Sequence, residues 1–340
     1  MRKLFLIWML SLAVSYLHAQ SYNNEWIDYS KTYYKFKVGK TGLYRISQST
    51  LAAAGVGLGN IPAEQFQLWR NGVEVALYTS VPAGVLPANG YIEFWGERND
   101  GKPDRDLYKN PANQLSDAIS LQTDTAAFFL TVNTAGNNRR LTDAVNDVAG
   151  NTLAPEPYFM YDYIYNFQYQ MNFGKPVYFG EYVYSSTYDV GEFWASQDIY
   201  QATPVKVIAG NLYPATTGPE PSMKVSFTGN SFFDNGARRA KVDINGTTVV
   251  DYRLVNVTAG VFTNNSPVAL SLLSSPVTNI NFSITNTIEN DRAAAGFVDI
   301  NYPRQFNFNG SANFKFSLPA SVQGNYLEIN NFNWGNVTAP

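Results

Sequence analysis

The chain has 340 residues, 27 acidic and 24 basic side chains, and a formal net charge of −3. It contains no cysteine and a single histidine, His18. The sequence therefore excludes Cys-His catalysis, a Cys/His zinc site and disulfide bonds. A mildly acidic chain without a cluster of Lys and Arg also argues against nucleic acid as a partner, and against charge-driven binding to an anionic membrane.

The first twenty residues have the pattern of a signal peptide. Arg2 and Lys3 precede the apolar run 4–17, and Ala19 offers a small-residue cleavage site close to Gln20. A membrane anchor is the alternative interpretation of this run. We expect export, loss of His18 with the signal, and no transmembrane segment in the mature chain, since no later run of about eighteen apolar residues follows.

Residues 21–150 are expected to form an N-terminal β domain. Alternating apolar residues over 33–38 and 43–46 indicate strands. Ser47 can cap a short helix over 48–54, and Asn71-Gly72 is typical of a type I′ hairpin turn. The segment Gly90–Tyr108 continues with a strand that places Ile92 and Phe94 on one face, and 126–132 is a buried strand.

Residues 151–340 are expected to form a second antiparallel β-sandwich or jelly-roll domain, truncated at its C-terminal end. The boundary is placed in the polar, breaker-rich stretch 136–157. Many short strands with Gly, Asn and Pro turns favour this fold class. The predicted strands lie at 205–208, 223–228, 240–244, 247–252, 268–273, 280–285, 295–301, 312–316 and 326–329.

Aromatic residues occupy every second position between residues 159 and 169. A strand would place all of them on one face. One interpretation is a docking face for a partner chain or for sugars, and the other is a core face. The residues are Phe159, Tyr161, Tyr163, Tyr165, Phe167 and Tyr169.

The loop after the strand at 91–96 gathers acidic side chains. Asp100, Asp104 and Asp106 offer the hard oxygen ligands that calcium takes, although their spacing does not match an EF-hand. Solvated turns closed by Asp side chains are the alternative interpretation. The carboxylate pairs Glu93/Glu97 and Glu181/Glu192 are the remaining candidates for acid–base chemistry, but no glycosidase motif surrounds them.

Several stretches together resemble a known family. The sequences YKFKV, GLYRIS and GYIEFWGERNDGKPDRDLY, within residues 33–132, resemble the N-terminal region of gingipain-like cysteine peptidases that act as sortases of the type IX secretion system. The stretch GEYVYSSTYDVGEFW at 180–194 is similar more weakly. The resemblance covers no catalytic residue, because the family's catalytic Cys and His have no counterpart in the chain.

The resemblance implies a parent protein at the bacterial cell surface or outer membrane that cleaves C-terminal signals from secreted cargo. Its partners would then be the peptidase domain of the same protein, the cargo and other surface components of the secretion system. No catalytic residue and no cofactor is assigned to this chain, apart from the calcium candidate. The alternative functions are a non-enzymatic module that binds glycans or a surface, and a purely structural surface protein.

Overall fold

The computed structural model describes residues 24–54, 57–142, 146, 148–231, 238–285 and 287–335. The expected signal peptide at 1–20 lies outside these residues. The chain divides into two compact units, one of residues 1–98 with 125–144 and one of residues 99–124 with 145–340. This division differs from the predicted boundary at residue 150, because residues 99–124 group with the second unit.

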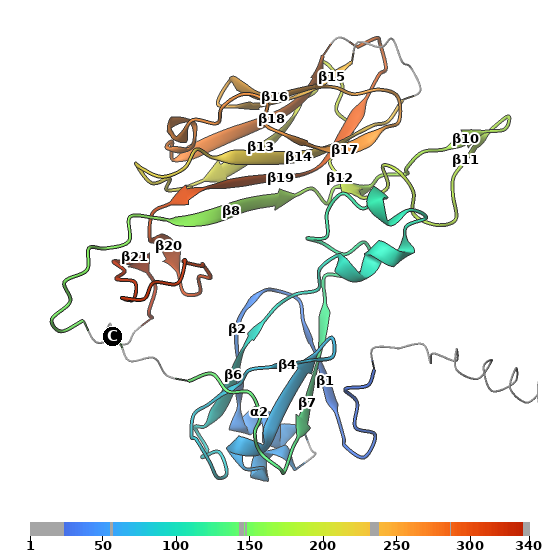
Figure 1. Cartoon of the computed structure of the whole chain (residues 1–340). Coiled ribbons are helices and arrows are strands. Elements are labelled where there is room, and N and C mark those ends of the chain that lie inside the picture. The colour runs from blue at the N-terminus through green and yellow to red at the C-terminus, as the bar shows by residue number, and fades with distance from the viewer. Residues whose placement is uncertain are drawn as a thin grey trace, which may run out of the picture. The chain divides into compact units, whose positions relative to one another are not determined.

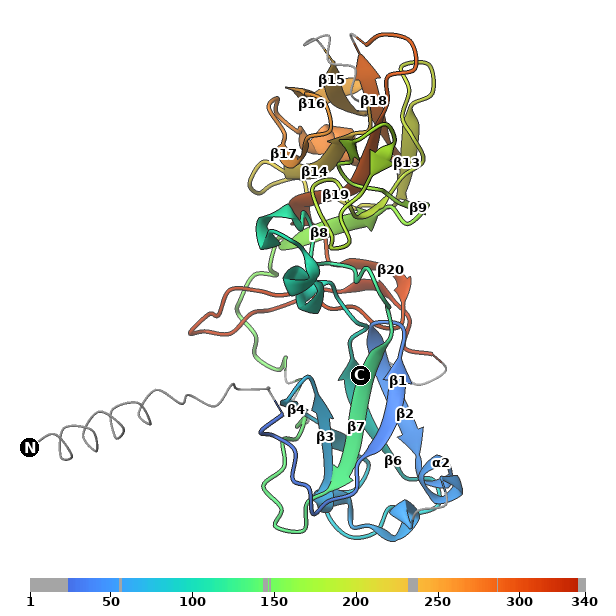
Figure 2. The same ribbon diagram turned by 90° about the vertical axis from the view of Figure 1, so that its right-hand side faces the viewer.

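The first unit is a small sandwich of two antiparallel sheets, whose strands can be followed in Figure 2. The four-stranded sheet has the order β1 (Tyr34–Val38), β7 (Ala126–Val132), β3 (Phe66–Arg70), β4 (Val73–Val75). The three-stranded sheet has the order β2 (Gly42–Ser47), β6 (Tyr91–Gly96), β5 (Tyr78–Thr79).

The first unit follows the sequence pattern closely. Ile92 and Phe94 of β6 are buried, and Phe94 lies 5.4 Å from Phe128 of β7 between ring centroids. The short helix α2 (Gln48–Ala53) has Ser47 as its N-cap, as predicted. The Ser47 hydroxyl accepts a hydrogen bond from the backbone N–H of Thr50. The predicted hairpin at residues 71–72 joins β3 to β4, and both turn residues have positive φ. Short 3₁₀ helices complete the unit: η1 (Leu58–Asn60) and η2 (Ala63–Gln65).

The second unit is a sandwich of two four-stranded antiparallel sheets, which Figure 1 shows as two layers. One sheet has the order β17 (Ala259–Thr263), β14 (Ser222–Gly229), β19 (Ala293–Arg304), β8 (Phe159–Asn166). The other has the order β13 (Val205–Gly210), β18 (Val277–Thr285), β15 (Arg239–Ile244), β16 (Thr247–Arg253). Their facing apolar side chains form the larger core of the chain, which confirms the predicted mostly β, sandwich fold class.

Smaller elements surround this sandwich. Two-stranded antiparallel pairs are β9 (Gln170–Met171) with β12 (Trp194–Ala195), and β10 (Val177–Tyr178) with β11 (Tyr182–Val183). A parallel pair joins β20 (Asn307–Ser311) to β21 (Asn330–Phe332). The 3₁₀ helices are η3 (Lys102–Leu107), η4 (Pro111–Asn113) and η5 (Leu270–Leu273).

Three predicted strands of the second unit were wrong or displaced. The strand predicted at 268–273 is wrong, because residues 270–273 form the 3₁₀ helix η5, which buries Leu273. Residues 312–316 form no strand, because Phe314 and Phe316 pack instead on the aromatic cluster around Phe159. The strand expected at 326–329 begins only at Asn330.

No helix within the described ranges is long and apolar enough to cross a membrane.

Candidate functional site

The predicted aromatic docking face belongs mainly to the core of the second unit. Among the described strands, β8 lies at the edge of its sheet beside β19, and most of its odd-numbered side chains turn towards the opposite sheet. Phe167 is buried in the sandwich core, and Tyr161 and Tyr163 are half-buried against it, while Phe159 is buried in a separate aromatic cluster with Phe306 and Phe308. Burial raises the pKa of the Tyr163 hydroxyl. The buried rings are already covered, so these positions agree with the alternative interpretation as a core face.

Two of the six residues are exposed. Tyr165 at the end of β8 is 41% exposed, and its ring lies against Phe167 at 5.1 Å. Tyr169 lies beyond the strand, which ends at Asn166, and is 71% exposed. Docking stays a prediction for these two side chains alone.

The acidic loop is held by its own hydrogen bonds. Asp104 is buried, and its Oδ2 accepts the amide of Leu121 at 2.6 Å. Asp100 accepts the Lys102 amide and pairs with the Lys102 ammonium at 3.0 Å, while Asp106 is exposed. No three carboxylates or histidines within the described ranges gather to hold a metal ion. The turn interpretation describes Asp100, which closes a local turn, but not the buried Asp104, which bonds a distant segment. Calcium binding by Asp100, Asp104 and Asp106 stays a prediction.

The glutamate pairs have structural contacts of their own. Glu93 pairs with Arg45 across β2 and β6 at 2.7 Å, and Glu97 lies 3.8 Å from Arg70. Glu192 is half-buried, which raises the pKa of its carboxyl, and it accepts the Asp189 amide. Glu181 is exposed at a hairpin tip. Neither glutamate pair is therefore arranged as the acid and base of a glycosidase.

The segment 99–124 packs on the sandwich through Tyr108. Its hydroxyl donates a hydrogen bond of 2.7 Å to the backbone oxygen of Glu192, and its ring lies 5.6 Å from Tyr188. Burial raises the pKa of Tyr108 above its usual range. Leu115 of the same segment lies against the small cluster around Phe193. The conspicuous sequence at 99–108 therefore anchors a segment onto the second unit.

An exposed aromatic hairpin is the largest surface feature that sequence reasoning missed. We call residues 173–184, which contain β10 and β11, the aromatic hairpin. Figure 1 shows it extending away from the layers of the sandwich. Its apolar side chains are between 45% and 78% exposed. They are Phe173, Val177, Tyr178, Phe179, Tyr182, Val183 and Tyr184.

The aromatic hairpin is ordered by local contacts. Val177 faces Val183 and Tyr178 faces Tyr182 in the antiparallel ladder, and the tip turns at Gly180 with φ +82°. The Tyr178 and Tyr182 rings lie 5.4 Å apart. The symmetric sequence VYFGEYVY around Gly180 is the signal that could have revealed this hairpin.

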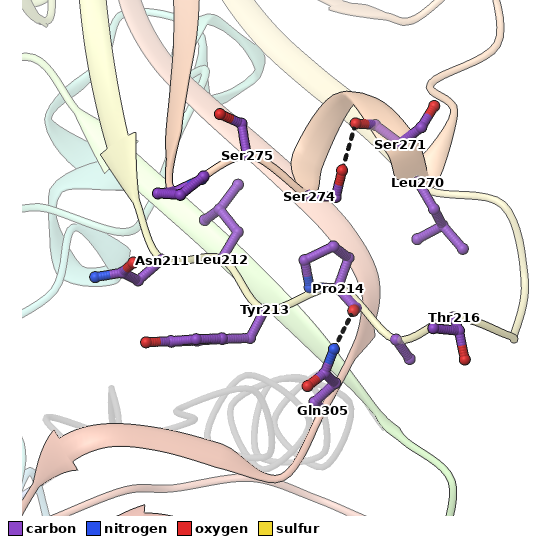
Figure 3. A pocket seen from close by; sticks show the side chains of 12 residues that line it. Asn211, Leu212, Tyr213, Pro214, Thr216, Leu270, Ser271, Ser274, Ser275 and Gln305 are labelled. Carbon is purple, nitrogen blue, oxygen red and sulfur yellow. Dashed lines mark hydrogen bonds between the residues drawn. The ribbon is translucent and has the colours of Figure 1, made fainter.

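A cleft of ≈ 460 Å³ opens beside the end of β13. Figure 3 shows Asn211, Tyr213 and Pro214 from the loop after β13, the serines of the η5 segment, and Gln305 from the segment that follows β19. None of its twelve lining residues carries a charge. Sequence reasoning had no signal for this cleft, because three distant segments form it.

Comparisons with known proteins concern the fold. No model of a protein family matches the chain, and no curated protein does. Among solved structures the chain is similar to dimeric latent PorU from Porphyromonas gingivalis, with 12% identity and a TM-score of 0.53 over 85% of this chain. The chain spans 26% of that PorU chain. At this identity the likeness shows a shared fold.

Two further solved structures have lower TM-scores. A carbohydrate-binding module CBM36 in complex with calcium and xylotriose has 16% identity and a TM-score of 0.24, over 32% of this chain and 90% of its own. The β-porphyranase BpGH86A from Bacteroides plebeius has 10% identity and a TM-score of 0.25, over 84% of this chain and 37% of its own. These scores are too low to support an inference.

Proposed function

We propose that this chain is the non-catalytic front portion of an exported gingipain-like cysteine peptidase that acts as a type IX secretion system sortase. The observation that carries the proposal is the fold likeness to latent PorU, with a TM-score of 0.53 over 85% of the chain. The sequence stretches within 33–132 that resemble the sortase family support it independently. The parent protein would work at the cell surface and cleave C-terminal signals from secreted cargo.

The catalytic groups of the parent protein would come from outside this chain. A cysteine nucleophile needs a thiolate and a base, and the chain has no cysteine. The chain spans 26% of the PorU structure, which leaves room for a peptidase domain in a longer protein. Residues 24–335 would then serve by holding and orienting that domain or its cargo.

The aromatic hairpin is the surface we assign to contact with the peptidase domain. Monomeric proteins rarely expose a contiguous group of large apolar side chains without a partner. Tyr and Phe bury much area at little entropic cost, and such residues are frequent at the centres of interfaces. Tyr178, Phe179 and Tyr182 at the hairpin tip are the proposed anchors.

The proposal is tested in source cells that carry variants of the gene. A triple substitution, Tyr178→Ser, Phe179→Ser and Tyr182→Ser, should impair removal of the C-terminal signal from secreted cargo, measured as a higher cargo mass. Tyr29→Ser is the control, because Tyr29 is also exposed, at 81%, but lies in the first unit. If deletion of the whole gene leaves cargo masses unchanged, the sortase function is contradicted.

A further inference from the structure

We propose that the cleft beside Tyr213 binds an uncharged saccharide. The cleft has a volume of ≈ 460 Å³, within the range of roughly 300–1,000 Å³ that is typical of small-ligand pockets. It lies wholly in the second unit, on loops that connect the two sheets. The inference is independent of the proposed sortase function.

The chemistry of the lining favours a neutral, hydroxyl-rich ligand. The cleft presents the Tyr213 ring, the apolar Pro214 and Leu270, and otherwise mainly hydroxyl and amide groups, while Leu212 lies buried beneath it. A sugar offers an apolar ring face that packs on aromatic and proline rings, and hydroxyls that pair with amides and serines. A phosphate or carboxylate ligand would call for cations, and the lining has none.

Several polar groups at the cleft are unused. Within the described part of the chain, the side chains of Asn211, Thr216, Ser271 and Ser275 make no hydrogen bond. Asn211 and Thr216 come from the loop after β13, and the two serines come from the segment around η5 (Figure 3). These groups are therefore available to a ligand without breaking a contact within the protein.

The loop that carries Tyr213 is held in a strained and anchored conformation. Tyr213 has φ +48° and Asn211 has φ +53°, a region that is uncommon for a bulky aromatic residue. Such strain persists only where surrounding contacts fix it, and it clusters at ligand sites. Here the Tyr213 hydroxyl donates a hydrogen bond to the side-chain oxygen of Asn309 at 2.9 Å. The backbone N–H of Gln305 donates a hydrogen bond to the backbone oxygen of Tyr213 at 2.9 Å.

A buried arginine supports the same loop from below. Arg304 donates to the Leu212 carbonyl at 3.0 Å, and its guanidinium lies 5.4 Å from the centroid of the Tyr213 ring. The buried hydroxyl of Tyr302 donates to the same carbonyl at 2.7 Å. Arg304 does not line the cleft, so its charge fixes the loop rather than facing a ligand. The ring is thus positioned before any ligand arrives, which lowers the cost of binding.

The test is calorimetric titration of the whole mature chain with neutral hexasaccharides: cello-, xylo-, laminari-, manno- and agaro-oligosaccharides, with oligogalacturonate as the charged comparison. We expect binding to at least one neutral probe and weaker binding to oligogalacturonate. Tyr213→Gly should weaken binding at least about tenfold, because it removes the stacking ring while glycine suits the positive φ. Tyr213→Phe keeps the ring and should retain most of the affinity.

Control variants separate a binding defect from a folding defect. Asn211→Gly also suits its positive φ, so reduced binding with an unchanged melting temperature would report the lost amide. Tyr29→Ala removes an exposed tyrosine of the first unit, outside the cleft, and should leave binding unchanged. The inference is overturned if no neutral probe binds at millimolar concentration, or if Tyr213→Gly binds like the wild type.

Discussion

β8 and the aromatic hairpin have similar sequences and opposite surroundings. β8 reads FMYDYIYN and the core of the hairpin reads VYFGEYVY, so each contains four aromatic residues. β8 pairs with β19 along its whole length and turns one face to the second sheet. Among the residues that the structure describes, the strands of the hairpin pair with each other alone. Its apolar side chains remain exposed because no second layer of described residues covers them.

The difference teaches that aromatic alternation identifies a strand but does not tell which strand serves as a surface. The alternation in β8 is perfect because one face is buried, as a sandwich requires. The hairpin departs from alternation at Phe179-Gly180-Glu181, where it turns. The feature that suggests interaction is therefore the aromatic group without a covering layer.

The largest expected effect concerns the buried side of this comparison. Phe159→Ala should lower the free energy of unfolding of the second unit by about 3–5 kcal/mol, because it opens a cavity in a packed aromatic cluster. The Phe159 ring lies 5.0 Å from Phe306 and 5.1 Å from Phe316. Urea denaturation followed by near-ultraviolet circular dichroism measures the change. Phe179→Ala in the hairpin is the control, expected within about 0.5 kcal/mol of the wild type. Equal losses at the two positions would break the comparison.

The second effect is a pH dependence of stability that arises from Tyr302, a buried residue of β19, the neighbour of β8. Burial raises the pKa of Tyr302 to about 12, from about 10 in an unfolded chain. The folded state holds this proton more tightly, so the stabilisation is complete below pH ~10 and is lost as pH rises towards the folded pKa.

The stability of the second unit should therefore fall by up to about 1.4 kcal/mol per pH unit in that window through this one group. Urea midpoints measured at successive pH values test this slope. Tyr302→Phe should flatten it in part, since Tyr108 and Tyr163 also have raised pKa values. An unchanged slope in Tyr302→Phe would show that this tyrosine is not buried as described.

The third effect is a loss of stability that we expect in the segment 99–124 and not in the aromatic hairpin. Tyr108→Phe removes the donor to the Glu192 backbone oxygen and should cost about 1 kcal/mol. Hydrogen exchange within 99–124 should accelerate accordingly. Tyr178→Phe is the matched control, because the Tyr178 hydroxyl has no hydrogen bond within the described ranges. The same exchange rates in both variants would contradict the anchoring role of Tyr108.

The smallest effect on stability is expected where the effect on function should be largest. The triple hairpin variant should unfold within about 1 kcal/mol of the wild type, since its side chains are exposed. Thermal melting measures this, and cargo processing in cells measures the function. A large loss of stability would show that the hairpin belongs to the fold rather than to an interface.

Much of the fold could be predicted from local sequence. The Asn71-Gly72 pair predicted the hairpin between β3 and β4, and Ser47 predicted the start of α2. The predicted strand at 126–132 coincides with β7. These features depend on backbone preferences over a few residues, which a single sequence carries directly.

The rest depended on contacts between distant segments. Whether Tyr163 or Tyr178 is buried depends on whether a second sheet packs over it. The local sequences around the two tyrosines are too similar to predict that difference. The segment 99–124 lies between two strands of the first unit, yet it packs with the second through Tyr108. The cleft needed three segments around Tyr213, Ser275 and Gln305 to come together. Such information enters only with the tertiary structure.

The most direct test of the central claim is hydroxyl-radical footprinting of the native protein from its source cells, with its mass measured on an immunoblot. We expect a species much larger than the 37.8 kDa of this chain. In it, Tyr178, Phe179 and Tyr182 should be protected relative to the same residues in the isolated chain. A native species of 37.8 kDa or less, with a hairpin labelled as strongly as in the isolated chain, would contradict the account.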